Sequence, residues 1–167
     1  MVKQELDMRE ISINKEPSSK EGGSSLFIKC QSQALVYLSM REHNRKELVL
    51  KLKTKGYEPD LIDSVLDSLE DDGSLNEERY VRSFIRSSNK RHPEGKLIMA
   101  RRLLAKGADE ETANRVLAEV YTEDYTRLLV KQADSDIRRK GKAKTEEDVR
   151  FCLKKLGFSN KDISFDD

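Results

Sequence analysis

The chain has 167 residues, 38% of them charged, and its 32 basic and 31 acidic side chains leave a formal net charge of +1. That length suits one compact domain or an array of small units. No run approaches the roughly 18 apolar residues of a membrane span, the first ten residues lack the apolar core of a signal peptide, and two cysteines are too few for a disulfide framework. We therefore expect a cytoplasmic protein.

Residues 1–30 differ from the rest of the chain. The segment EPSSKEGGSS at 16–25 is polar and rich in glycine and serine, which is typical of a linker or mobile loop. The apolar stretches at 11–14 and 26–29 flank this segment. They are expected either to pair as a short β-hairpin or to belong to a disordered tail.

The remaining chain repeats one pattern about every fifty residues. In each copy two apolar residues stand four apart, and a glycine follows four residues after the second. The members are Leu48, Leu52 and Gly56, then Met99, Leu103 and Gly107, then Val149, Leu153 and Gly157. Such a pattern predicts an amphipathic helix that ends on a glycine with positive φ. We assign the three glycines as structural turn residues.

Two more helices belong to each copy. One follows the glycine, beginning near Glu58, Asp109 or Ser159, with Pro59 at its first position in the first copy. The other precedes the copy, at 33–40, 76–88 and 124–140. Capping boxes are expected at 44–47 and 145–148, and Pro93 is expected in a first helical turn. The sequence therefore predicts an all-α fold of three tandem three-helix repeats at 31–72, 73–121 and 122–167, the third truncated.

Charge is segregated along the first two repeats. Residues 58–78 carry nine carboxylates and no Lys or Arg, whereas residues 79–106 carry nine Lys or Arg and one Glu. On a helix after Asn76, Arg79, Arg82 and Arg86 share a stripe opposite the apolar side chains. This pattern indicates either a phosphate-binding surface or a solvated face that pairs with the acidic stretch. Ile98 falls among the basic residues of the next helix, which suggests contact with a neighbouring repeat.

The basic residues of the second repeat and of the run at 138–144 are the candidate binding residues. They are Arg79, Arg82, Arg86, Arg91, Lys96, Arg101, Arg102, Lys106, Arg138, Arg139 and Lys140. No metal-ligand spacing, glycine-rich phosphate loop or nucleophile elbow accompanies them. We therefore expect no catalytic residue, no metal and no cofactor.

Three segments in order resemble the RecX family, regulators of the bacterial recombinase RecA. They are ALVYLSMREHNRKELVLKLKTKGY (34–57), GSLNEERYVRSFIRSS (73–88) and GKLIMARRLLAKGADEE (95–111). The resemblance covers residues 33–165. It departs at Ser74, Val81 and Ala108, where the family commonly has an aromatic, a small residue and Ile, and some relatives carry a β-rich N-terminal extension.

The resemblance implies an elongated, curved, all-α monomer that binds the RecA–single-stranded DNA filament within its groove. It implies inhibition of ATP hydrolysis, strand exchange and coprotease activity in DNA repair and the SOS response. The alternative is a non-catalytic helical DNA-binding module or a transcriptional regulator with a helix-turn-helix element. The basic residues spread over two helices and a loop, which favours electrostatic contact with single- and double-stranded DNA over base readout.

Overall fold

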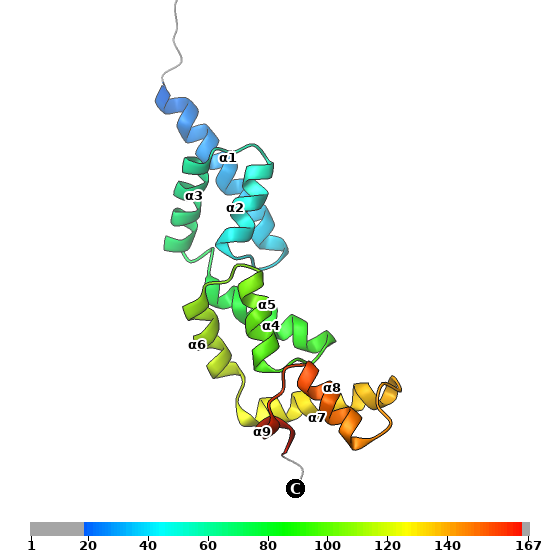
Figure 1. The fold of residues 1–167 in the computed structure, drawn as a ribbon. Helices are drawn as coiled ribbons and strands as arrows, with labels where there is room; N and C mark the ends of the chain where they lie inside the picture. The colour runs from blue at the N-terminus through cyan, green and yellow to red at the C-terminus, as the bar shows by residue number, and fades with distance from the viewer. Residues whose placement is uncertain (1–18, 165–167) are drawn as a thin grey trace, which may run out of the picture.

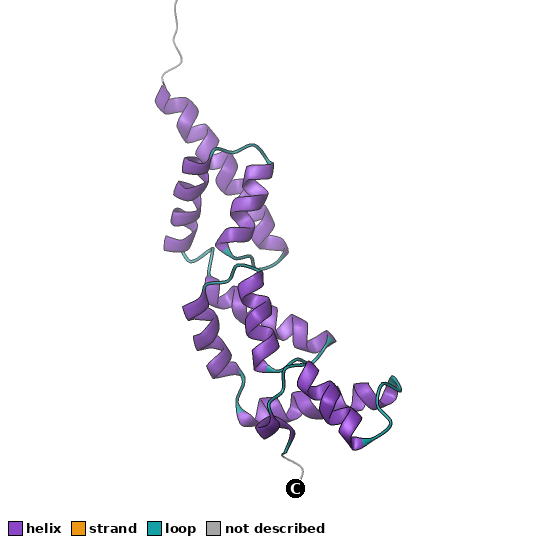
Figure 2. Cartoon of the chain, viewed as in Figure 1, coloured by secondary structure: helices purple, strands orange, loops and turns teal. Residues whose placement is uncertain are grey.

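The computed structural model describes residues 19–164, which form nine α-helices and no strand (Figures 1 and 2). The helices are α1 (Ser19–Met40), α2 (Arg45–Thr54) and α3 (Pro59–Asp71), then α4 (Glu77–Arg91), α5 (Lys96–Ala105) and α6 (Glu110–Val120), then α7 (Glu123–Arg139), α8 (Glu146–Lys155) and α9 (Asn160–Ile163). The units of three follow one another along an elongated, curved array (Figure 1). The expected all-α fold of three tandem three-helix repeats is confirmed.

Each unit has its own apolar core. The first gathers around Leu48, Leu52 and Leu66, and includes Leu75 from the connection that leads to the second unit. The second unit buries Met99 and Leu103, among others. The third has a smaller core with no residue below 1% exposure, since its third helix has only four residues. Only Tyr121 of the described side chains packs against two cores, those of the second and third units.

The three predicted turn glycines adopt the left-handed conformation. Their φ angles are 85° at Gly56, 87° at Gly107 and 87° at Gly157. The residue after each glycine donates its N–H back to the carbonyl of the last leucine of the pattern, for example Ala108 to Leu103 at 3.0 Å. These bonds satisfy carbonyl groups that the end of the helix leaves without partners. The sequence pattern therefore encodes both the helix and its end.

Helix starts agree with the sequence except at Pro93 and at α1, and one of the two expected capping boxes is incomplete. Thr145 forms a complete capping box with Asp148, and Pro59 occupies the first turn of α3. Asn44 caps α2 by accepting the N–H of Glu47, but the Glu47 carboxylate binds His43 and Arg41 instead of completing a box. Pro93 precedes α5, whose N-cap is Gly95, so the expected helical turn at Pro93 was wrong.

The N-terminal segment also differs from expectation. Residues 26–29, predicted as one strand of a hairpin or as tail, lie inside α1, while the partner stretch 11–14 lies outside the described residues. The linker prediction likewise fails from residue 19 onward. The helix extends this far because Phe27 and Cys30 pack on the core of the first unit, and this tertiary burial outweighs the low helix propensity of glycine and serine.

The units meet through turns and connections. Between the first and second units, the Asn44 side-chain amide donates to the Lys106 carbonyl at 2.9 Å. Between the second and third, the Gly95 N–H donates to the Leu156 carbonyl at 2.8 Å. Ile98 contacts Gly157 across the same joint, as its place among basic residues had suggested.

Candidate nucleic-acid interface

The predicted arginine stripe lies on α4, which the local sequence holds in place. The Asn76 side chain accepts the N–H of Arg79 at 2.9 Å and so caps the helix. Glu77 and Glu78 lie in the first turn, where a carboxylate complements the helix dipole. Tyr80 and several apolar neighbours on the opposite face are buried, and this burial turns the arginines toward solvent.

The Arg79 guanidinium is bound to other groups of the protein. Its Nε donates to Glu42 of the first unit at 3.0 Å, and its two terminal nitrogens donate to the carbonyls of Gly73 and Ser74, each at 2.8 Å. The guanidinium therefore secures the turn before α4 and links the first two units. Few of its donors are left for a phosphate.

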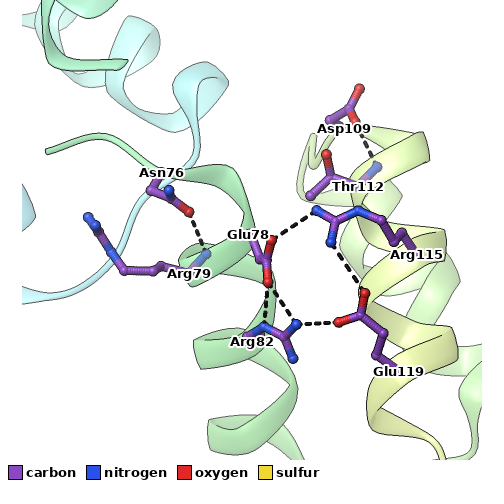
Figure 3. A network of polar contacts seen from close by, with 8 residues as sticks. All are labelled: Asn76, Glu78, Arg79, Arg82, Asp109, Thr112, Arg115 and Glu119. Atoms are coloured by element: carbon purple, nitrogen blue, oxygen red, sulfur yellow. Dashed lines mark hydrogen bonds and ion pairs between the residues drawn. The ribbon is translucent and has the colours of Figure 1, made fainter. Parts of the chain in front are cut away.

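Arg82 belongs to a network of two arginines and two glutamates that joins α4 to α6 (Figure 3). Arg82 pairs with Glu78 at 2.7 Å and with Glu119, and Arg115 pairs with Glu78 at 2.9 Å and with Glu119 at 3.3 Å. Hydrogen bonds from Arg82 and Arg115 lower the pKa of Glu78, and Glu78 and Glu119 raise the pKa of Arg82. Since the four charges cancel, the network presents no free positive charge.

Three further candidates are paired within or between neighbouring helices. Arg102 binds Glu94 at 2.6 Å and lies over the Phe84 ring at 5.2 Å. Arg138 and Arg139 pair with carboxylates of the third unit, namely Asp134, Glu146 and Asp136. The alternative that the solvated face pairs with the acidic stretch 58–78 is not met at these positions, since none of these carboxylates lies in that stretch.

The other six candidates are exposed and form no ion pair with any side chain from 23 to 164. They are Arg86, Arg91, Lys96, Arg101, Lys106 and Lys140. All but Lys140 belong to the second unit. The structure thus divides the predicted set into paired arginines and a group of unpaired cations, and this unpaired group is the candidate interface.

Sequence reasoning missed the partners that make this division. Arg115 and Glu119 lie 37 residues from the α4 residues they bind, and Glu42 lies 37 residues before Arg79. No local sequence pattern predicts an ion pair between residues so far apart in the chain. The one available signal was the spacing of Arg115 and Glu119 at i, i+4, which places them together on one helix face.

Three further features of the described residues concern metal ions, thiols and membranes. Residues 19–164 contain no group of three His, Cys, Asp or Glu side chains placed to hold a metal ion. Cys30 is buried and Cys152 is partly buried, and both are free thiols. None of the helices within these residues is both long and apolar enough to span a bilayer.

These features define a helical-repeat protein whose middle unit presents unpaired basic side chains. Residues 30–69 match the family model described as RecX, first three-helix domain. The chain is 31% identical over 131 residues to the regulatory protein RecX of Bacillus subtilis (strain 168), covering 77% of this chain and 50% of that protein. It is 28% identical over 130 residues to the regulatory protein RecX of Pelodictyon phaeoclathratiforme (strain DSM 5477 / BU-1), covering 78% of this chain and 81% of the other.

The chain is similar to proteins of the RecX family, and these relatives carry the name of regulatory proteins. The crystal structure of RecX from Lactobacillus salivarius has the same fold, with a TM-score of 0.71 at 24% identity over 84% of this chain and 93% of that one. The chain spans about half the length of the Bacillus subtilis relative and of a Chlorobium limicola relative to which it is 38% identical over 86 residues.

Proposed function

We propose that this protein regulates a RecA-type recombinase by binding along the filament that the recombinase forms on single-stranded DNA. Similarity to proteins of the RecX family is the observation that carries the proposal. Binding restrains ATP hydrolysis, strand exchange and coprotease activity. The chain acts as a cytoplasmic monomer and as a modulator rather than an enzyme.

The shape of the molecule supports binding along a filament. Three units with separate cores follow one another in a curved array, and this array presents an extended surface (Figure 1). The longest helix of the third unit, α7, has 17 residues and so spans about 25 Å. An array of three such units reaches more than one filament subunit. Linked weak contacts then give an avidity that exceeds the affinity of any single unit.

The charge distribution supports contact with two kinds of surface. On α3 the carboxylates of Asp60 and Asp71 are exposed and pair with no cation among the side chains of residues 23–164, whereas Asp63 and Asp67 surround Arg45. The second unit instead presents unpaired cations such as Arg86 and Arg101. In our proposal the first unit faces protein and the second faces the DNA backbone, which it contacts without reading sequence.

The DNA-dependent ATPase of the cognate recombinase tests this proposal. The intact chain should lower the rate at substoichiometric ratios, because one bound molecule spans several subunits. Strand exchange should slow in parallel, and pull-down of filaments should weaken at high salt as phosphate contacts are lost. If ATPase and strand exchange are both unchanged at saturating protein, a simple DNA-binding module replaces the regulator.

A further inference from the structure

A groove lies at the junction of the first and second units. It encloses about 350 Å³, near the lower end of the range of about 300–1,000 Å³ for small-ligand sites. Its lining comes from the connection after α1, from α2, from α4 and from the residue after α5. The residues are Arg41, Glu42, Glu47, Tyr80, Ser83, Phe84, Ser87, Arg91 and Lys106.

The charges that line this groove leave an excess of cations. Glu42 is bound by Arg79 at 3.0 Å, and Glu47 is bound by Arg41 at 2.9 Å. Arg91 and Lys106 have no carboxylate partner among the side chains of residues 23–164. Because the two carboxylates are already compensated, the two remaining cations make the groove attractive to an anion.

The floor of the groove holds a buried hydroxyl without a hydrogen bond of normal geometry. Tyr80 is 2% exposed, and its hydroxyl is the one buried side-chain N or O atom among the described residues without such a bond; the Asn44 side chain is its polar neighbour. Burial raises the pKa of Tyr80 to about 12, so the hydroxyl remains a proton donor at neutral pH. Since native structures rarely leave such a donor unpaired, a bound group is its natural partner.

We propose that this groove binds a phosphodiester group of single-stranded DNA. Arg91 and Lys106 pair with the phosphate oxygens, and the Tyr80 hydroxyl donates to one of them. The donors come from α4 and from the turn after α5, and a tetrahedral phosphate accepts from several directions whereas a carboxylate accepts largely in one plane. A single strand bends its backbone into a recess, which a stiff duplex does not. The proposal rests on the DNA contact of the proposed function and gives that contact a location.

The full-length chain and a fluorescein-labelled oligothymidylate test the groove by fluorescence anisotropy, with no recombinase present. Tyr80→Phe should weaken binding roughly ten- to a hundredfold, the worth of one hydrogen bond to a charged group. Its urea midpoint should stay the same or rise, because the variant removes a buried unpaired hydroxyl. A Tyr80 that served structure alone would show the opposite, with unchanged affinity and a lower midpoint.

The contribution of Arg91 and Lys106 is tested by one variant of each, with a matched control. Arg91→Ala and Lys106→Ala should each lower the slope of log affinity against log salt by about 0.7, as expected for one phosphate contact on a single strand. Lys106→Ala keeps the backbone carbonyl that accepts from Asn44, so the joint persists. Arg101→Ala is the control, since Arg101 is exposed and unpaired but lies outside the groove, and it should cost clearly less affinity.

Three results would overturn the proposal that this groove binds a phosphodiester group. They are equal losses for Arg101→Ala and Arg91→Ala, full affinity in Tyr80→Phe, and displacement of the oligonucleotide by oligoglutamate more readily than by inorganic phosphate. The last would assign the groove to an acidic protein segment. Because the assay lacks the recombinase, none of these results bears on whether ATPase is inhibited, and a failed ATPase test leaves the oligothymidylate result intact.

Discussion

Gly95 and Gly157 meet backbone to backbone at the joint between the second and third units. A Cβ on Gly95 would lie 2.1 Å from the carbonyl oxygen of Gly157 and 2.5 Å from the nitrogen of Phe158. Gly95 has φ −72°, which any residue adopts, so its need for glycine is steric. The joint closes only because neither partner carries a side chain.

Gly95→Ala should therefore destabilise the protein by more than about 2 kcal/mol, because backbone atoms cannot move aside as a side chain can. Urea unfolding measures the effect. Gly23→Ala is the matched control, since Gly23 lies in α1 with nothing within 4 Å, and alanine there should stabilise by about 0.5–1 kcal/mol. Equal midpoints for the two variants would contradict the close contact.

The loss of stability on replacing each turn glycine should depend on the atoms that surround it. Gly56 has open space, so Gly56→Ala reports the cost of positive φ alone, about 1–2 kcal/mol. Gly157→Ala should cost more, because its Cβ would also lie 2.9 Å from the backbone nitrogen of Ile98. Gly107→Ala should stay close to Gly56→Ala, since its contact is the movable side chain of Lys46. Valine should exceed alanine at all three. Thermal melts that overlay the parent would refute the turn assignment.

His43 should make the first unit sensitive to acid. Its ring is 2% exposed, and burial lowers its pKa although its Nδ1 lies 2.8 Å from a Glu47 carboxylate oxygen. The unfolded chain therefore binds a proton more readily than the folded one. Stability is complete above the ordinary histidine pKa of about 6.5 and declines as the pH falls below it. Urea midpoints of parent and His43→Gln across pH 5–8 test this. A parent midpoint that stays flat across that window would speak against it.

Glu47 should extend the loss of stability to lower pH. Burial raises its pKa, but hydrogen bonds from Arg41 and His43 outweigh burial and lower it overall. Its contribution is present above the ordinary glutamate pKa of about 4.3 and is lost as the pH falls through the lowered value. Glu47→Gln should therefore flatten the stability curve between about pH 5 and pH 3. A slope equal to that of the parent would exclude this role.

Asn89 should be a stabilising residue of the second joint. Its side-chain nitrogen donates to the hydroxyls of Tyr121 and Tyr125 at 3.0 and 3.1 Å, and its oxygen accepts the Glu94 N–H at 3.1 Å. Asn89 is 3% exposed, so Asn89→Ala leaves partners unsatisfied and should cost about 2 kcal/mol or more. Asn114→Ala, on the exposed face of α6, should stay within about 0.5 kcal/mol of the parent in urea.

Substitution of a paired arginine and of an unpaired arginine should affect DNA binding differently. Arg86→Ala should lower the salt slope on single strands by about 0.7 and leave the urea midpoint unchanged. Arg82→Ala removes a member of the α4–α6 network and should lower the midpoint while changing the slope less. The same slope change in both variants would mean that the network opens to bind phosphate.

The repeat could be predicted because its determinants are local. An apolar pair four residues apart and a glycine four residues later specify a helix and its end in each copy, so Gly56, Gly107 and Gly157 were placed correctly. The start of α1 could not be predicted this way. The Gly22–Gly23 pair disfavours a helix locally, and only packing of Phe27 and Cys30 on distant helices reverses that preference.

The sequence could show which basic residues lie on the candidate interface, but it could not show which of them are free of ion pairs. Helical periodicity placed Arg79, Arg82 and Arg86 on one exposed stripe, as the structure has them. Their different roles depend on carboxylates brought in by the tertiary fold, and Arg86 alone of the three is unpaired among the described residues. Tyr80 was identified only as core, since no sequence pattern shows that a buried hydroxyl lacks a partner.

The two joints of the array differ in mechanical character. At the second, main-chain atoms of Gly95 contact those of Gly157, and backbones packed this closely leave little freedom to bend. At the first, the Arg79–Glu42 ion pair spans two flexible side chains that are 49% and 28% exposed, and salt weakens such pairs, whereas the Asn44–Lys106 hydrogen bond carries no charge. Added salt should therefore loosen the first joint in part and leave the second unchanged.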